Sequence, residues 1–154
     1  MPGAAGGLAG ETFAACAAAA LYRVEAFRQA GGFDEGFFCY YEDVDLAFRL
    51  RLLGGHCVKV ADAVVRHVGG ATTGSASAFA AYHLARNQVW TFVKDMPGPL
   101  FWPLLAGHAA LHLLLLLRAA SHGLAEPVAR GLLDALRHLG PVWRARRRAS
   151  SPAP

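Results

Sequence analysis

Two adjacent acids and an isolated histidine are the residues of this chain best suited to chemistry. Glu42 and Asp43 open the pattern EDVDLAFRLRLLGG, which predicts a helix that stops at Gly54 and Gly55. A carboxylate there can act as a general base, or it can only complement the helix dipole. His67 stands alone near the end of the β-prone piece VVRHV. Taken by itself, such a residue is more often a satisfied core or surface histidine than a metal ligand.

Other polar pairs in the sequence favour structural roles. Asp45 and Arg49 have the i,i+4 spacing of a helical ion pair in its favourable order, so we expect a salt bridge there rather than catalysis. His108 and His112 have the spacing of two metal ligands on one helical face. No glutamate lies between them and no third ligand is nearby in sequence, so packing is the better explanation.

Composition and charge indicate a folded chain with a lipid or protein partner. Of the 154 residues, 55% are hydrophobic and 17% are charged, which is too apolar for a disordered chain. The net charge of +4 comes from the end of the chain, since residues 118–154 contain seven arginines and two acids. A basic segment beside an apolar one favours an anionic membrane surface. Nucleic acid is disfavoured because the basic tail offers only Trp143 as a stacking platform.

Cysteine usage and the N-terminal residues point to the cytosol. Cys16, Cys39 and Cys57 are odd in number and widely spaced among apolar residues, which predicts buried, reduced thiols. The opening MPGAAGGLAGETFAA has no positive charge before its small apolar residues, so it lacks the form of a secretory signal.

The hydrophobic pattern predicts an α/β part followed by helices. Expected strands cover Phe13–Tyr22, Cys57–Val60 and Val64–Val68, although the alanines of Phe13–Tyr22 also allow a helix there. Expected helices cover Arg23–Ala30, Glu42–Leu53, Ser77–Asp95, Gly123–Leu139 and Val142–Arg148. An apolar segment, residues 96–117, contains no Lys, Arg, Asp or Glu. As a full helix it would span ~33 Å, close to the thickness of a bilayer.

The block GGFDEGFFCYYEDVDLAFRLRLLGG, residues 31–55, resembles a known family. Together with VVRHVG and the element YHLARN at residues 82–87, it is similar to the C-terminal half of family-2 glycosyltransferase catalytic domains, including rhamnosyltransferase-like members. The resemblance covers roughly residues 12–95. It implies an α/β fold of the GT-A (Rossmann-like) kind and sugar transfer from a nucleotide-sugar donor with inversion.

The resemblance also implies roles for individual residues. Asp43 would be the base that deprotonates the acceptor hydroxyl, and Glu42 would contact the acceptor or influence the base by like-charge proximity. His67 would help to hold a divalent cation, Mn²⁺ or Mg²⁺, on the donor diphosphate. The family's metal-binding DxD motif belongs to a preceding region, so this chain would hold little of the metal site. Arg86, Asn87 and Arg23 are the candidate substrate-binding residues, of which Arg86 is either a phosphate contact or a surface arginine.

We therefore expect three segments. Residues 1–76 would be a truncated GT-A sheet remnant on the acceptor side, residues 77–148 a helical membrane-interface tail, and residues 149–154 a disordered terminus. We expect such a chain to be incomplete and inactive alone. The alternative is a non-catalytic membrane adaptor.

Topology limits how the tail can meet a membrane. The donor is cytosolic and the arginine-rich end also prefers the cytosolic side, so a single crossing does not satisfy both. We therefore predict monotopic or peripheral association with the cytoplasmic face, with Trp102 and Trp143 at headgroup level and a lipid-linked glycan as the implied acceptor. Packing of Leu111–Leu117 against the catalytic part or in a homodimer stays open.

Overall fold

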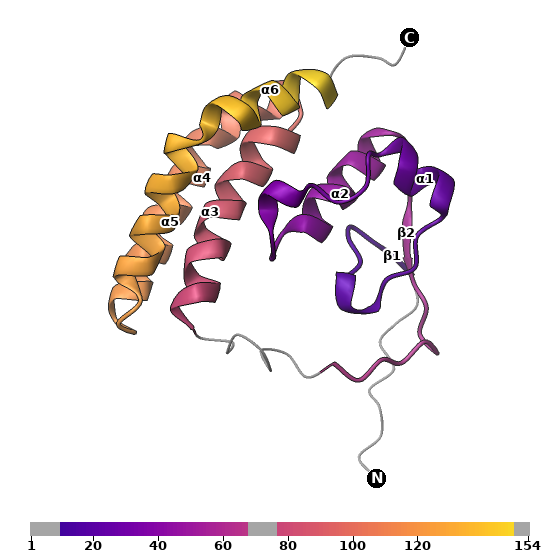
Figure 1. Ribbon diagram of the computed structural model, residues 1–154, viewed down its shortest axis with the longest axis horizontal. Coiled ribbons are helices and arrows are strands. Elements are labelled where there is room, and N and C mark those ends of the chain that lie inside the picture. The colour runs from indigo at the N-terminus through magenta and orange to yellow at the C-terminus, as the bar shows by residue number, and fades with distance from the viewer. Residues whose placement is uncertain (1–9, 68–76, 150–154) are drawn as a thin grey trace.

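The computed structural model describes residues 10–67 and 77–149, with side chains up to Arg146. This part of the chain is mostly helical and carries one small antiparallel sheet. Figure 1 shows two groups of elements side by side, one from residues 10–67 and one from the four helices that follow. The arrangement is consistent with part of an α/β fold.

The first group is a strand pair with short helices between its strands. Strand β1 (Gly10–Thr12) pairs with β2 (Cys57–Lys59), with Gly10 opposite Lys59 and Thr12 opposite Cys57. Between them lie a 3-10 turn η1 (Ala17–Ala19), helix α1 (Val24–Gln29), a second 3-10 turn η2 (Glu35–Phe37) and helix α2 (Glu42–Leu52).

Helices α1 and α2 confirm the predicted positions. After α1, Gly31 and Gly32 have φ angles of +84° and +70°, which glycine adopts without steric penalty. After α2, Gly54 (φ +82°) donates its N–H to the Arg51 carbonyl at 2.9 Å. The pair Asp45–Arg49 forms the predicted i,i+4 salt bridge.

Two strand predictions are wrong. The run Phe13–Tyr22 contains the 3-10 turn η1 instead of a strand, and Leu21 is completely exposed. The register ends where Thr12 meets Cys57, so residues beyond Thr12 have no partner strand among those described, and alanine has little intrinsic preference for strands. Residues 64–67 are exposed and form no strand for the same reason, and Val68 lies outside the described residues.

The prediction of buried cysteines is also wrong. Cys16 is exposed, and Cys39 and Cys57 are only half-buried, although all three thiols are free. For Cys16 the cause is the missing strand, since it was expected inside one.

The second group is built around α3 (Ala78–Asp95). Its Ser77 N-cap hydroxyl accepts a hydrogen bond from the Ala80 N–H at 3.1 Å, as a cap should. Helices α4 (Gly98–Ala120), α5 (Ala125–Arg137) and α6 (Leu139–Ala149) complete it, and α5 lies along α3. A side chain at Gly131 of α5 would collide with the Tyr82 carbonyl oxygen, so glycine permits this close approach. Residues 150–154, most of the predicted disordered terminus, lie outside the described residues.

Helix α4 is long, apolar and largely uncovered. Its 23 residues have the length and composition of a membrane span, and only 11% of its most apolar window is buried by the rest of the described chain. The side it turns inward includes Phe101 and the two histidines, with the His108 ring stacked 4.1 Å from the Phe92 ring. The Nε2 atoms of His108 and His112 lie 3.1 Å apart, and no third ligand joins them within the described residues. Core packing therefore accounts for both histidines.

Candidate active site

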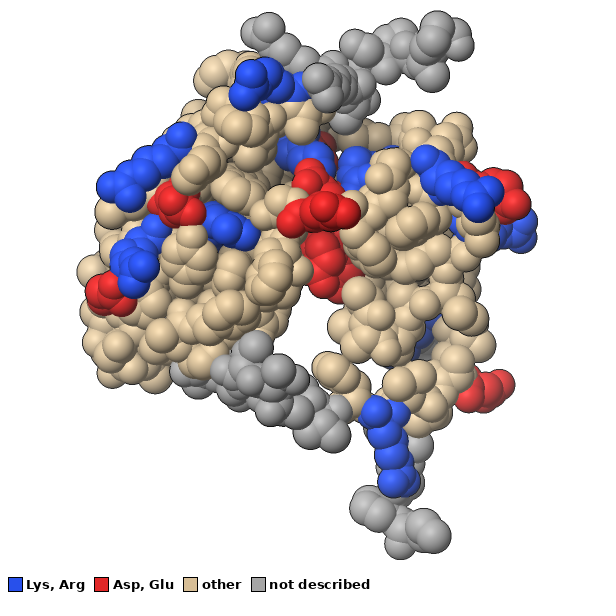
Figure 2. All heavy atoms as spheres, viewed as in Figure 1, with Lys and Arg blue, Asp and Glu red and all other residues tan. Residues whose placement is uncertain are grey.

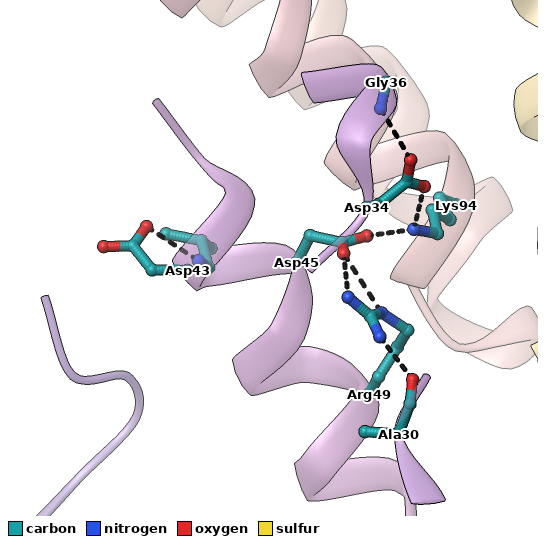
Figure 3. Close-up of polar contacts among 8 residues, drawn as sticks. Ala30, Asp34, Gly36, Asp43, Asp45, Arg49 and Lys94 are labelled. Carbon is teal, nitrogen blue, oxygen red and sulfur yellow. Dashed lines mark hydrogen bonds and ion pairs between the residues drawn. The ribbon is translucent and has the colours of Figure 1, made fainter. Parts of the chain in front are cut away.

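The acid pair lies at the start of α2, where the loop from η2 reaches the helix. The Asp43 carboxylate accepts one hydrogen bond from the Val44 N–H at 2.8 Å and one from the Ala17 N–H at 3.0 Å. It is half-buried, and Figure 3 shows it pointing away from the neighbouring ionic cluster. The backbone thus fixes the direction of this carboxylate without neutralising it by a cation.

Glu42 has a less satisfied environment. Its Oε2 atom is buried and has no hydrogen-bond partner in the described part of the chain. Burial, and to a lesser extent the adjacent Asp43 charge, raises the pKa of Glu42 above its ordinary value. The sequence prediction concerned the opposite direction, an effect of Glu42 on Asp43, and it stays a prediction. An unpaired acid beside a fixed carboxylate is an arrangement suited to exchanging hydrogen bonds and protons with a bound hydroxyl.

A buried ionic cluster links α2 to α3 just behind the acid pair. Asp45 is fully buried and forms ion pairs with Arg49 and, at 2.5 Å, with Lys94 of α3. Lys94 also pairs with Asp34 at 2.6 Å, and Asp34 in turn accepts the Gly36 N–H at 2.9 Å (Figure 3). The cluster fastens the loop, α2 and α3 to one another, which gives Asp45 the structural role predicted from its spacing.

Asp95 completes the cluster as a neutral acid. It is 2% exposed, and burial together with the neighbouring Asp45 carboxylate raises its pKa to about 9. It therefore keeps its proton at neutral pH. Two carboxylates, Asp34 and Asp45, then balance the two cations Arg49 and Lys94, so the cluster carries no excess charge. Sequence reasoning missed Asp34, Lys94 and Asp95.

Arg86 and Asn87 hold the loop that leads to the acid pair. Asn87 is fully buried, and its Nδ2 donates to the Cys39 and Tyr40 carbonyls at 2.8 and 2.7 Å. Arg86 donates to Asn87 Oδ1 at 2.9 Å and to the Phe37 carbonyl at 2.9 Å. Both side chains are thus occupied by protein groups, and in this structure Asn87 is closed off from any substrate. Their contact with substrate, expected from the resemblance, stays a prediction.

The remaining predicted residues lie apart from these contacts. Arg23 is the exposed N-cap residue of α1, and its side chain makes none of the described hydrogen bonds or ion pairs. His67 is exposed and is the last described residue before residues 68–76. No three potential His, Cys, Asp or Glu ligands gather anywhere in residues 10–67 and 77–149. These residues therefore do not fit a divalent cation by themselves, and the convergence of His67 with Asp43 stays untested.

A depression also borders the ionic cluster. It has a volume of about 650 Å³ and is lined by residues of the α1–η2 loop and of α6, together with Arg49 and Lys94. Neither Glu42 nor Asp43 lines it. In Figure 2, acidic side chains gather at the junction between the two groups of elements. We take the acid pair as the candidate site because its unpaired oxygen and fixed carboxylate are suited to chemistry, whereas Arg49 and Lys94 in the depression are already paired.

Comparison with known proteins supports glycosyl transfer. Over 107 residues the chain is 40% identical to the N-acetylglucosaminyl-diphospho-decaprenol L-rhamnosyltransferase of Mycobacterium tuberculosis, in both the CDC 1551 and the H37Rv strain. The match covers 65% of this chain and 34% of the relative. The chain thus spans about a third of the length of these curated relatives. No family model matches it, and no solved structure matches it significantly.

Proposed function

We propose that this chain forms the acceptor side of the active site of an inverting, family-2 glycosyltransferase with the GT-A fold. The observation that carries the proposal is the acid pair: Asp43 is held by two backbone N–H groups beside Glu42, which has a buried, unpaired oxygen. The similarity to a rhamnosyltransferase supports this chemistry. By analogy with that relative, the acceptor is an N-acetylglucosaminyl-diphospho-polyprenol and the donor a nucleotide-activated deoxyhexose.

The proposed reaction needs one base and one displacement. Asp43 takes the proton of the acceptor hydroxyl while the hydroxyl oxygen forms a bond to the anomeric carbon of the donor. The bond from that carbon to the nucleotide diphosphate breaks on the opposite face, and its electron pair leaves with the diphosphate, so the configuration inverts. Glu42, with its raised pKa, retains a proton more readily than a free glutamate and can donate a hydrogen bond to the acceptor.

The donor side lies outside the site described above. We propose that residues beyond this chain hold most of the nucleotide and of its Mn²⁺ or Mg²⁺, with His67 as one ligand, and that the isolated chain has little activity.

The test is a transfer assay on the chain extended by its upstream coding sequence. Asp43→Asn should reduce transfer by about 10²–10⁴-fold while the protein stays folded, because that is the typical contribution of general-base catalysis. Asp62→Asn, at an exposed acid in the turn after β2, is the matched control and should leave transfer unchanged. Transfer that survives Asp43→Asn would rule out this residue as the base.

One observation favours a second candidate, a membrane adaptor without catalysis. The apolar α4 is largely uncovered, and arginines are concentrated in the residues after it. We propose on this basis that the chain associates with anionic lipid at the cytoplasmic face of the membrane, in either candidate function. A homodimer that buries α4 is the competing arrangement. An extended chain that binds lipid but never transfers sugar would favour the adaptor.

A further inference from the structure

The loop before the acid pair contains a rare and strained turn. Phe38 has φ 63° and ψ −60°, and the Cys39 N–H donates to the Phe37 carbonyl at 2.8 Å across it. This is the form of γ-turn that side-chain-bearing residues seldom adopt. Tyr40 and Tyr41 also have positive φ angles, of 64° and 70°. Backbone strain of this kind persists only where surrounding contacts impose it, and it is concentrated at binding and active sites.

The contacts that impose it come from α3 and lie on both sides of Phe38. Before it, Arg86 donates to the Gly36 and Phe37 carbonyls at 3.2 and 2.9 Å. After it, Asn87 donates to the carbonyls of Cys39 and Tyr40. The two flanking segments are therefore fixed, and the direction of the Phe38 side chain is set with them.

That direction is outward. The Phe38 side chain is 75% exposed, although the turn that presents it is strained. Its ring lies near two rings of the first turns of α3, with centroids 5.7 Å from His83 and 6.4 Å from Phe79. Phe79 is also exposed, whereas His83 is buried beneath the two. Neither the strained backbone nor the exposed ring stabilises the described part of the chain, which motivates a functional explanation for the turn.

This surface lies close to the acid pair. Phe38 precedes Glu42 by four residues, so their Cα atoms lie within about 14 Å. Cys39 lies close enough to Glu42 for the glutamate charge to contribute, after burial, to raising the pKa of the thiol. In a transfer to a hydroxyl, the part of the acceptor nearest the base is the sugar ring that bears this hydroxyl. The apolar C–H face of such a ring is about the size of one phenyl ring.

We propose that the Phe38 ring forms an aromatic platform on which the acceptor sugar ring stacks while its hydroxyl faces Glu42 and Asp43. The Phe79 ring meets Phe38 at an interplanar angle of 77°, so it borders the platform and does not extend it. The assignment rests on the proposed function. It makes Phe38 a specificity-determining residue and gives Arg86 and Asn87 the task of positioning it.

Titration calorimetry on the full chain tests the proposal with two probes. One is N-acetylglucosaminyl-diphospho-farnesol, and the other is farnesyl diphosphate, which lacks the sugar. Phe38→Gly should weaken binding of the sugar-bearing probe about tenfold, the upper range for one aromatic contact, and leave the sugar-free probe unaffected. The same change should raise Tm by roughly 2–4 °C, because glycine relieves the strained turn. Phe38→Leu, which keeps an apolar side chain, should weaken sugar binding equally.

Leu21→Gly is the matched control, because Leu21 is fully exposed and distant in sequence from the loop. It should change neither affinity. The proposal is overturned if the wild-type chain does not bind the sugar-bearing probe, if Phe38→Gly binds it unchanged, if both probes weaken together, or if Phe38→Gly unfolds the chain. Transfer lost in Asp43→Asn but unaffected by Phe38→Gly would remove the platform and keep the proposed function. Transfer retained in Asp43→Asn, together with sugar binding lost in Phe38→Gly, would rule out the proposed role of Asp43 and keep the platform.

Discussion

Replacing Asn87 by leucine tests whether α3 holds the strained loop in place. Leucine has nearly the same size and shape, so the change removes polar contacts without opening a cavity. In the wild type, the buried amide satisfies the carbonyls of Cys39 and Tyr40 at 2.8 and 2.7 Å, and a third, longer bond reaches Phe37 at 3.1 Å. It also accepts a hydrogen bond from Arg86.

The expected loss of stability follows from these partners. Each buried group left without a hydrogen bond costs about 1–3 kcal/mol. Loss of the two short bonds alone lowers the free energy of unfolding by about 3 kcal/mol. Loss of the bonds to Phe37 and from Arg86 lowers it further, and relaxation of the strained turn offsets part of that further loss. A loss of about 3 kcal/mol is a large fraction of the 5–15 kcal/mol that typically stabilises a domain.

Urea unfolding followed by tryptophan fluorescence measures this loss. Trp90 is a local reporter, since the Arg86 guanidinium lies 4.4 Å from its ring. The midpoint should fall while the slope with urea stays constant. Gln88→Leu, which removes only the bond to the Tyr41 hydroxyl at 2.6 Å, is the neighbouring control and should cost about 1 kcal/mol. A loss below 1 kcal/mol for Asn87→Leu would refute the claim that this amide fixes the loop.

Three further changes test other parts of the structure. Asp95 has a folded-state pKa of about 9 against an ordinary value of 3.8, so the folded state binds an extra proton between these values and loses stability as pH rises. Asp95→Asn removes this loss, and its stability relative to wild type in urea should increase from pH 4.5 to pH 8; a constant difference would contradict the neutral acid. Leu113→Glu on the exposed side of α4 should reduce co-sedimentation with anionic liposomes, whereas an unchanged pellet, or a wild-type chain that stays in the supernatant, would refute membrane contact there. Gly131→Ala should destabilise the chain by about 1–3 kcal/mol through the collision with Tyr82, while Gly107→Ala, in open space on α4, should be neutral or stabilising; equal effects of the two would contradict the close helix packing.

Local signals in the sequence predicted most of the helices. Ser77 caps α3 and the glycine pairs after α1 and α2 end them, because caps and left-handed glycines act within one turn of the chain. The Asp45–Arg49 pair followed from i,i+4 spacing for the same reason. The acid pair was also found from sequence, through the block around it.

The strands and the connections around the site depended on partners far away in the chain. Whether Phe13–Tyr22 forms a strand depends on whether another strand lies beside it, and β2 pairs only as far as Thr12.

One signal in the sequence could have revealed the ionic cluster and the contacts of the loop. Asn87, Thr91, Lys94 and Asp95 recur at helical spacing and are all buried, which marks a polar stripe on α3 that must meet polar partners.

The sequence by itself therefore determined where the helices lie and which acids begin α2, since these depend on neighbours within a few residues. Only the tertiary structure decided that Lys94 would neutralise Asp45, that Asn87 would hold the loop at Cys39 and Tyr40, and that Phe38 would face outward. These contacts join residues 47 to 49 positions apart or depend on such contacts. Their partners are chosen by packing of α3 against the first group of elements, which no local pattern specifies.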